Sequence, residues 1–406
     1  MACPLYRTGH VVTQFCDPRR LGKFLCGYSS PYMIYILTII FFLYLAALGW
    51  IRTGMFRLPY FRGSAAVPKT RFTVIVPFRN EAENIPRLLR SIAALDYPIE
   101  LFEVILVNDA SEDESLKVIR DNIQDYNCDL KLIQNKRTSA SPKKDAITTA
   151  IAEATYEWIL TTDADCELPG KWLQLYDQYI QKNQPKMVFA PVVYPASKNL
   201  LKNFQFLDGL SLQAVTMGAL GWKRPLLCNG ANMGYTKKAF YAVNGYKGND
   251  HIASGDDIFL MEKIRELYPK TIKYIKNKDA AVITRPEESW DGVLSQRVRW
   301  ASKASQQKNR GTKLLGISVF LVNLVFLACI LGIVINIEYY KWYVGFLFLK
   351  IIADLLVLTP IASFFNSQIS LPGYLINALL YPFIIVWVVF ASFWGNYRWK
   401  GRKFKK

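Results

Sequence analysis

Histidine is almost absent from this chain of 406 residues, in which only His10 and His251 occur. A metal site built from several histidines is therefore excluded. A histidine general base is nearly excluded as well, because only His251 lies in the central part of the chain. Acid–base chemistry at any active site would then fall to aspartate and glutamate.

Paired cysteines and a glycine-rich nucleotide loop are lacking too. The seven cysteines are odd in number, scattered, and contain no Cys-x-x-Cys pair, which favours a reducing compartment over a disulfide framework. No Gly-x-Gly-x-x-Gly follows the first predicted strand, where the chain reads Pro77-Phe-Arg-Asn-Glu81. This argues against a membrane-tethered Rossmann oxidoreductase.

Signatures of nucleic-acid binding are also missing, although the formal net charge is +18. The chain has no zinc-finger, basic-zipper or RNA-binding motif, so we expect no nucleic-acid partner. Its basic residues instead cluster beside apolar stretches, between Arg52 and Arg71 and from Arg398 to the C-terminus. This placement predicts contact with the anionic headgroups of membrane lipids.

Long apolar runs are what the chain has in abundance. Residues 31–52 form a predicted transmembrane anchor, which is retained because no basic head precedes it and no small-residue cleavage site follows. A C-terminal membrane region is expected at 313–396. Polar residues 1–30 are an unassigned N-terminal extension, and 397–406 are a basic tail. These features predict a multi-pass protein of the cell membrane with a cytoplasmic central domain.

In the C-terminal membrane region, the number of apolar stretches conflicts with the charge of the tail. It holds three apolar stretches (314–337, 343–365 and 371–394); if all three cross, the basic tail ends outside, whereas its charge favours the inside. Either the stretch with Lys350 and Asp354 is re-entrant or interfacial, or the charge rule fails. These two residues share a helix face and either line a lipid or sugar path or form a pair facing neighbouring helices.

The central region, residues 70–288, alternates short apolar runs with helical patterns. This alternation predicts an α/β fold with a mainly parallel sheet and helices on both faces. Strands are expected at 71–77, 103–108, 130–134, 158–162 and 186–193, and residues 227–235 are expected to form a glycine-containing strand or loop. Helices are expected at 85–95, 113–126, 143–154, 200–220 and 256–268.

Carboxylates follow two of these predicted strands, at Asp109 and at Asp163-Ala-Asp165. Open α/β sheets bind nucleotides at such strand ends. Because carboxylates repel phosphates, they need a bridging divalent cation, Mg²⁺ or Mn²⁺, which Asp163 and Asp165 can ligate. The sequence therefore predicts a metal-bound diphosphate. Further carboxylates, Asp256 and Asp257, remain for proton transfer and follow a glycine-containing loop, 245–255, that we expect to be mobile.

Residues 289–311 are expected to form an amphipathic helix in the membrane interface, with Arg297, Lys303 and Lys308 flanking its apolar side. Gln296, Arg299 and Trp300 fall at i, i+3 and i+4 on one face. An amide, a guanidinium and an indole there could hold a diphosphate and a sugar ring. The alternative is an ordinary lipid-facing pair of arginine and tryptophan.

Taken together and in this order, the motifs resemble those of family 2 glycosyltransferases, the inverting nucleotide-sugar enzymes with a GT-A fold. The resemblance covers residues 72–300. Its motifs are Val-Ile-Val-Pro77-Phe-Arg-Asn-Glu81, Val107-Asn-Asp109, Thr162-Asp163-Ala-Asp165, Asn229-Gly230-Ala-Asn-Met, Ser254-Gly-Asp256-Asp257 and Gln296-Arg-Val-Arg299-Trp300. The last matches the Q-x-x-R-W signature of membrane-bound members, which include polysaccharide synthases and ceramide glucosyltransferase-like enzymes.

The resemblance implies a role for each motif. Pro77, Glu81 and Asp109 would contact the nucleotide base or ribose, and Lys143 or Lys144 would lie near the base or phosphates. Asp163 would contact the nucleotide diphosphate and, with Asp165, bind the metal. The remaining roles fall on the acceptor side: Asn229 and Gly230 would form a loop there, Gln296, Arg299 and Trp300 would bind diphosphate and acceptor, and Asp257 would be the base, beside Asp256, which either raises its pKa or caps the helix.

The function implied is transfer of a sugar from a nucleotide-diphosphate sugar, a UDP-sugar above all, to a hydroxyl of a lipid or lipid-linked glycan. Transfer would invert the anomeric carbon at the cytoplasmic membrane face. One alternative is a processive polysaccharide synthase, for which four apolar stretches are few to enclose a channel. Another is a non-catalytic nucleotide-binding scaffold, against which the intact acidic motifs argue.

Overall fold

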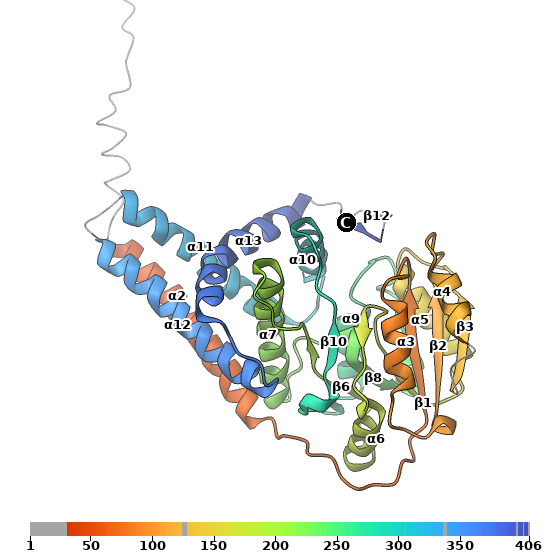
Figure 1. Ribbon diagram of the computed structural model, residues 1–406. Helices are drawn as coiled ribbons and strands as arrows, with labels where there is room; N and C mark the ends of the chain where they lie inside the picture. The colour runs from red at the N-terminus through yellow and green to blue at the C-terminus, as the bar shows by residue number, and fades with distance from the viewer. Residues whose placement is uncertain are drawn as a thin grey trace, which may run out of the picture.

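A computed structural model describes residues 31–123, 128–304, 306–335, 339–394, 397–400 and 402–404, so the predicted N-terminal extension lies outside the described residues. Figure 1 shows an α/β domain at one end of the molecule and a group of long helices at the other. Helices α7 (Leu200–Gly221) and α10 (Trp290–Ala304) lie between the two parts.

The domain is built on a seven-stranded sheet in the order β3-β2-β1-β4-β8-β6-β9. Pairing is parallel except on the two sides of β8, which runs antiparallel to β4 and β6, so the mainly parallel sheet is confirmed. The strands are β1 (Phe72–Phe78), β2 (Phe102–Asn108), β3 (Asp129–Gln134), β4 (Trp158–Thr161), β6 (Met187–Phe189), β8 (Met233–Thr236) and β9 (Ile272–Tyr274).

Helices cover both faces of this sheet, because alternate side chains of a strand point to opposite sides. Val74 and Val76 of β1 belong to one core, and Ile75 belongs to the other. The first core is completed by α3 (Ile85–Ala93), α4 (Ser115–Ile123) and α6 (Trp172–Asn183). The second is completed by α5 (Pro142–Glu153), α7 and α9 (Asp256–Leu267).

One predicted strand was wrong in extent, and the segment expected to be a strand or a loop contains both. Residues 186–193 divide into β6 and β7 (Val192–Val193), because β7 leaves the main sheet to pair with β10 (Val282–Thr284), which also pairs with β5 (Cys166–Glu167). In 227–235 only the end is a strand, since Gly230–Asn232 form a 3₁₀ turn ahead of β8. Sequence pattern does not reveal such changes of partner.

Among the described residues, four helices are long and apolar enough to cross a membrane. They are α2 (Pro31–Arg57), α11 (Arg310–Ile335), α12 (Tyr340–Phe364) and α13 (Leu371–Trp394). Glycines bring α2 against α7 so closely that a Cβ added to Gly221 would lie 1.8 Å from the carbonyl oxygen of Gly54. Small residues permit such close helix contacts, and here they fix the domain to the first membrane helix.

Lys350 and Asp354 of α12 form an ion pair of 2.9 Å, and Asp354 also accepts a hydrogen bond from the hydroxyl of Tyr44 in α2. Lys350 is buried. The pair thus faces a neighbouring helix, as one of the two interpretations expected.

Candidate active site

A cavity of about 1360 Å³ opens at the carboxyl ends of β1, β2 and β4. Parallel strands bring their carboxyl ends to the same edge of a sheet, which is why residues distant in sequence meet there. The cavity is lined by every residue named as a site candidate except Lys144: Pro77, Glu81, Asp109, Lys143, Asp163, Asp165, Asn229, Gly230, Asp256, Asp257, Gln296, Arg299 and Trp300.

Lys143 connects the two groups of carboxylates. Its Nζ lies 2.6 Å from Asp163 Oδ1 and 3.4 Å from Asp256 Oδ2. Gly230 approaches the same point, since a Cβ there would lie 3.0 Å from Asp256 Oδ2 and 3.8 Å from Lys143 Nζ. The Asp-x-Asp motif and the Asp256-Asp257 motif therefore border one small volume, although more than 90 residues separate them.

Asp163 and Asp165 offer the hard oxygen atoms that Mg²⁺ and Mn²⁺ prefer. Burial, together with the nearby charges of Asp163 and Glu81, raises the pKa of Asp165 to about 7, and Lys400 partly offsets this. Such a carboxylate gains from a cation beside it. Within the described ranges no three His, Cys, Asp or Glu side chains gather as a metal site. The two aspartates fit a cation whose other ligands would come from a diphosphate.

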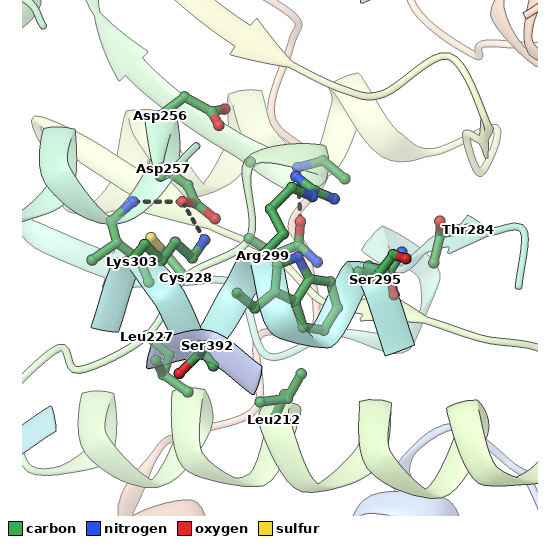
Figure 2. Close-up of a pocket in the computed structure, with 18 of the residues that line it drawn as sticks. Leu212, Leu227, Cys228, Asp256, Asp257, Thr284, Ser295, Arg299, Lys303 and Ser392 are labelled. Carbon is green, nitrogen blue, oxygen red and sulfur yellow. Dashed lines mark hydrogen bonds and ion pairs between the residues drawn. The ribbon is translucent and has the colours of Figure 1, made fainter. Parts of the chain in front are cut away.

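Asp256 and Asp257 begin helix α9, after Gly255 with φ of 82°. Lys303 of α10 lies 3.4 Å from Asp257 Oδ1, and Figure 2 shows these two side chains directed toward one another. Burial raises the pKa of Asp256, but Lys143, Lys303 and Lys144 outweigh that effect and hold it below its usual value. Asp256 is therefore an ionised neighbour of Asp257.

Lys144, the other candidate lysine, lies outside the cavity lining. It is buried, and its Nζ donates hydrogen bonds to the carbonyl oxygens of Asn249 at 2.6 Å and Ile252 at 2.8 Å. Of the two adjacent lysines, only Lys143 borders the cavity. Lys144 instead fixes the loop at 245–255 that leads into Asp256.

Helix α10 presents Gln296, Arg299 and Trp300 to the cavity, so these three share a face as expected. The prediction for Arg297 was wrong. Instead of flanking the apolar side, Arg297 is buried and donates from Nε to Asp208 Oδ2 of α7 at 2.6 Å, with its guanidinium 4.3 Å from the ring centroid of Trp300. The counter-charge on α7 makes this burial possible.

The basic tail contributes two residues that the sequence analysis assigned to lipid headgroups. Lys400 Nζ lies 2.5 Å from Glu81 Oε1, and the guanidinium of Arg402 is paired with the carboxylate of Asp109. For Lys400 and Arg402 the headgroup prediction was wrong, because carboxylates of the domain attract them. About 300 residues separate the partners, so no local sequence signal indicated these contacts.

Comparisons with known proteins give a family match and several relatives. Residues 73–240 match glycosyl transferase family 2. Over 236 residues the chain is 25% identical to a probable glycosyltransferase, YdaM of Bacillus subtilis (strain 168), covering 57% of this chain and 54% of that protein. Over 230 residues it is 27% identical to the poly-β-1,6-N-acetyl-D-glucosamine synthase of Staphylococcus epidermidis (strain RP62A), covering 55% and 52%. The chain thus spans about half the length of these relatives.

Among solved structures, the mannosyltransferase PcManGT of Pyrobaculum calidifontis, in complex with GDP-Man and Mn²⁺, superposes with a TM-score of 0.53 at 18% sequence identity. The alignment covers 89% of this chain and 98% of that one. At this identity the likeness concerns the fold, which is the GT-A-like Rossmann architecture expected from the sequence.

Proposed function

We propose that this chain, whose residues 73–240 match glycosyl transferase family 2, transfers a sugar from a nucleotide-diphosphate sugar to an acceptor hydroxyl at a membrane. One observation carries the proposal. The Asp163/Asp165 pair and Asp257 line the same cavity, and Lys143 and Gly230 lie between them. A leaving diphosphate and an attacking hydroxyl can therefore meet over a single sugar carbon.

The donor would lie across the carboxyl ends of the strands. Pro77, Glu81 and Asp109 line the part of the cavity nearest β1 and β2, where the nucleoside of a UDP-sugar is proposed to bind. Asp163 and Asp165 would hold the diphosphate through Mg²⁺ or Mn²⁺. When bound, this cation neutralises the charge of the departing diphosphate. Lys143, which is cationic beside Asp163, would add a direct contact to the phosphate oxygens.

Asp257 is the proposed general base. As the acceptor oxygen bonds to the anomeric carbon, the bond from that carbon to the diphosphate oxygen breaks and the hydroxyl proton passes to the Asp257 carboxylate. Attack from the face opposite the leaving group inverts the anomeric carbon. Arg299 and Trp300, on the α10 face of the cavity, would hold the diphosphate and the acceptor with Gln296, and Asn229 would border the acceptor.

The contacts of the basic tail support a proposal for how many helices cross the membrane. Because Lys400 and Arg402 contact Glu81 and Asp109, we infer that the tail lies on the same side of the membrane as the domain, the cytoplasmic side favoured by its charge. An even number of the helices between the domain and the tail must then cross the membrane. We assign the crossings to α11 and α12.

Helix α13, rather than the stretch with Lys350 and Asp354, would remain on the domain side. Near its start, a Cβ on Gly373 would lie 2.8 Å from Asn203 Nδ2 of α7. Near its end, Ser392 lines the catalytic cavity. Contacts to the domain at both ends fit a helix that dips into the membrane and does not cross it.

The base assignment has a direct test. Asp257→Asn should bind the donor as wild type does and lose transfer, because an amide cannot accept the proton. Asp279→Asn, which removes an exposed carboxylate on the surface, is the matched control and should leave both unchanged. Normal turnover by Asp257→Asn would show that another group is the base.

A processive synthase is the second candidate, favoured by the similarity to the Staphylococcus epidermidis polymer synthase. Chain length of the product made from a labelled donor separates it from single transfer. A non-catalytic scaffold would bind the diphosphate and release none from any donor.

A further inference from the structure

The catalytic cavity does not end at Asp257. The same cavity continues along the membrane helices, where α11 and α13 line it together with α7. Leu315, Val319 and Phe320 line it from α11, and Ile385 and Val389 line it from α13. At about 1360 Å³ it exceeds the range of roughly 300–1,000 Å³ that is usual for a small-ligand site. It has room for more than a nucleotide sugar.

The chemistry of this extension favours hydrocarbon over carbohydrate. A glycan chain carries a hydroxyl on nearly every carbon, and each buried hydroxyl without a hydrogen-bond partner costs free energy. The five side chains named above from α11 and α13 are aliphatic or aromatic, whereas α7 adds Ser211, Gln213 and Thr216 to the lining. At the catalytic end the lining becomes polar, with Asp257 and Lys303 on one side and Ser392 where α13 ends, as Figure 2 shows.

Part of the lining of this extension is exposed at the surface of the membrane helices. Ile317 and Leu324 of α11 line it and are 53% and 41% exposed. Large apolar side chains exposed on a helix that is long enough to span a bilayer contact lipid. A membrane lipid could therefore enter from the bilayer without leaving the hydrocarbon phase.

We propose that the acceptor is a lipid with a neutral hydroxyl headgroup, whose hydrocarbon chain occupies the groove between α11 and α13 while its hydroxyl lies at Asp257. This inference rests on the proposed function and names its acceptor class. The hydroxyl oxygen bonds to the anomeric carbon, the diphosphate leaves with the electrons of its carbon–oxygen bond, and the proton goes to Asp257.

The headgroup is assigned from the charges at the meeting point. A phosphate-headed lipid is already an anionic nucleophile and needs no base, and the carboxylates of Asp256 and Asp257 would repel it. Lys303 is already paired with Asp257, and Lys143 and Arg299 are assigned to the leaving diphosphate. A neutral hydroxyl has a proton to give, which is what a carboxylate base requires.

Two glycines provide a matched pair of variants. A Cβ added to Gly316, which lines the groove, or to Gly345 of α12, which does not, would meet no atom within 4 Å. Gly316→Phe should fill the groove without disturbing the backbone, and Gly345→Phe adds the same ring outside the cavity. Val389→Trp, from the opposite wall, is a second blocking variant.

The assay uses purified protein in mixed micelles with 1,2-dioleoylglycerol as the lipid probe and a nucleotide-sugar panel as donors. We expect Gly316→Phe and Val389→Trp to lose transfer to the lipid by about tenfold or more, the effect of overpacking a fitted site. Donor binding should stay at the wild-type level in both, and Gly345→Phe should transfer as wild type does.

Three outcomes would overturn the inference while leaving glycosyl transfer intact. They are unchanged lipid transfer by both blocking variants, transfer to undecaprenyl phosphate but not to dioleoylglycerol, and preferential transfer to a water-soluble glycan. Failure of the wild-type protein to release diphosphate from any donor would instead overturn the proposed function, and this inference with it.

Discussion

Arg297 and Asp208 form a buried ion pair, with Nε of the arginine 2.6 Å from Oδ2 of the aspartate. It joins α10, which carries Gln296, Arg299 and Trp300, to α7, which packs against the membrane helices. The ion pair thus fixes α10 on α7 and orients the face of α10 that lines the cavity.

Removing one partner of this pair should be costly. Asp208→Asn leaves the Arg297 charge buried without a counter-charge, which is expected to lower the free energy of unfolding by about 3–5 kcal/mol. Thermal unfolding in detergent measures the loss. The double variant Asp208→Leu/Arg297→Met should recover most of it, because apolar pairs replace buried ion pairs well. A single variant as stable as wild type would contradict the buried-pair assignment.

Divalent-cation binding should depend on pH near neutrality. Burial and the charges of Asp163 and Glu81 raise the pKa of Asp165 to about 7, and only the ionised carboxylate ligates a metal. Mn²⁺ affinity should therefore fall about tenfold between pH 8 and pH 6. Isothermal titration with Mn²⁺ and a nucleoside diphosphate provides the measurement. In the Asp165→Asn variant, the pH dependence of Mn²⁺ affinity should vanish. Equal affinity at both pH values would show that Asp165 does not titrate near pH 7 as a ligand of the cation.

Lys400 of the basic tail should affect the pKa of Asp165 as well. Lys400 lowers the pKa of Asp165, so Lys400→Met is expected to raise that pKa further. The midpoint of the pH dependence of Mn²⁺ binding should then move to a higher pH, and donor affinity at pH 7 should fall. Lys278→Met, at an exposed position away from the cavity, is the control. An unchanged midpoint would mean that the contact between Lys400 and Glu81 has no electrostatic effect on the metal site.

Lys144 should control the order of the loop at 245–255. Its two hydrogen bonds to the carbonyl oxygens of Asn249 and Ile252 are charge-assisted, and each such bond contributes about 1.5–3 kcal/mol. Lys144→Met should therefore speed hydrogen exchange of this loop at least about tenfold. Mass spectrometry of exchange reads the effect directly. The exposed Lys247 supplies the control, as Lys247→Met, and equal protection in both variants would refute the anchoring role.

Local patterns predicted most of the fold and of the site. The alternation of apolar runs placed each of the strands β1 to β4, and the acidic motifs after β2 and β4 were recognisable because strand ends converge by topology. The choice between Lys143 and Lys144 was beyond such reasoning. Neighbouring helical residues point about 100° apart, and which of them meets the cavity depends on how α5 rotates against the sheet.

Contacts between distant parts of the chain account for what the sequence did not reveal. Asp208, Lys400 and Arg402 each find a charged partner brought near only by the assembled fold. From the sequence alone, a cationic tail after an apolar helix is as consistent with contact to lipid headgroups as with contact to carboxylates of the domain. The strand expected at 186–193 failed for a similar reason, since β10, the partner of β7, lies about 90 residues further along the chain.

Release of diphosphate from nucleotide sugars tests the central claim most directly. Purified protein with Mn²⁺ and a membrane-lipid extract as acceptor should release diphosphate from at least one donor of a panel. Chelation should stop the reaction and added Mn²⁺ restore it, and Asp163→Asn and Asp257→Asn should each abolish it. Release from no donor, or release at the wild-type rate by both variants, would contradict the assignment of this cavity as a glycosyl-transfer site.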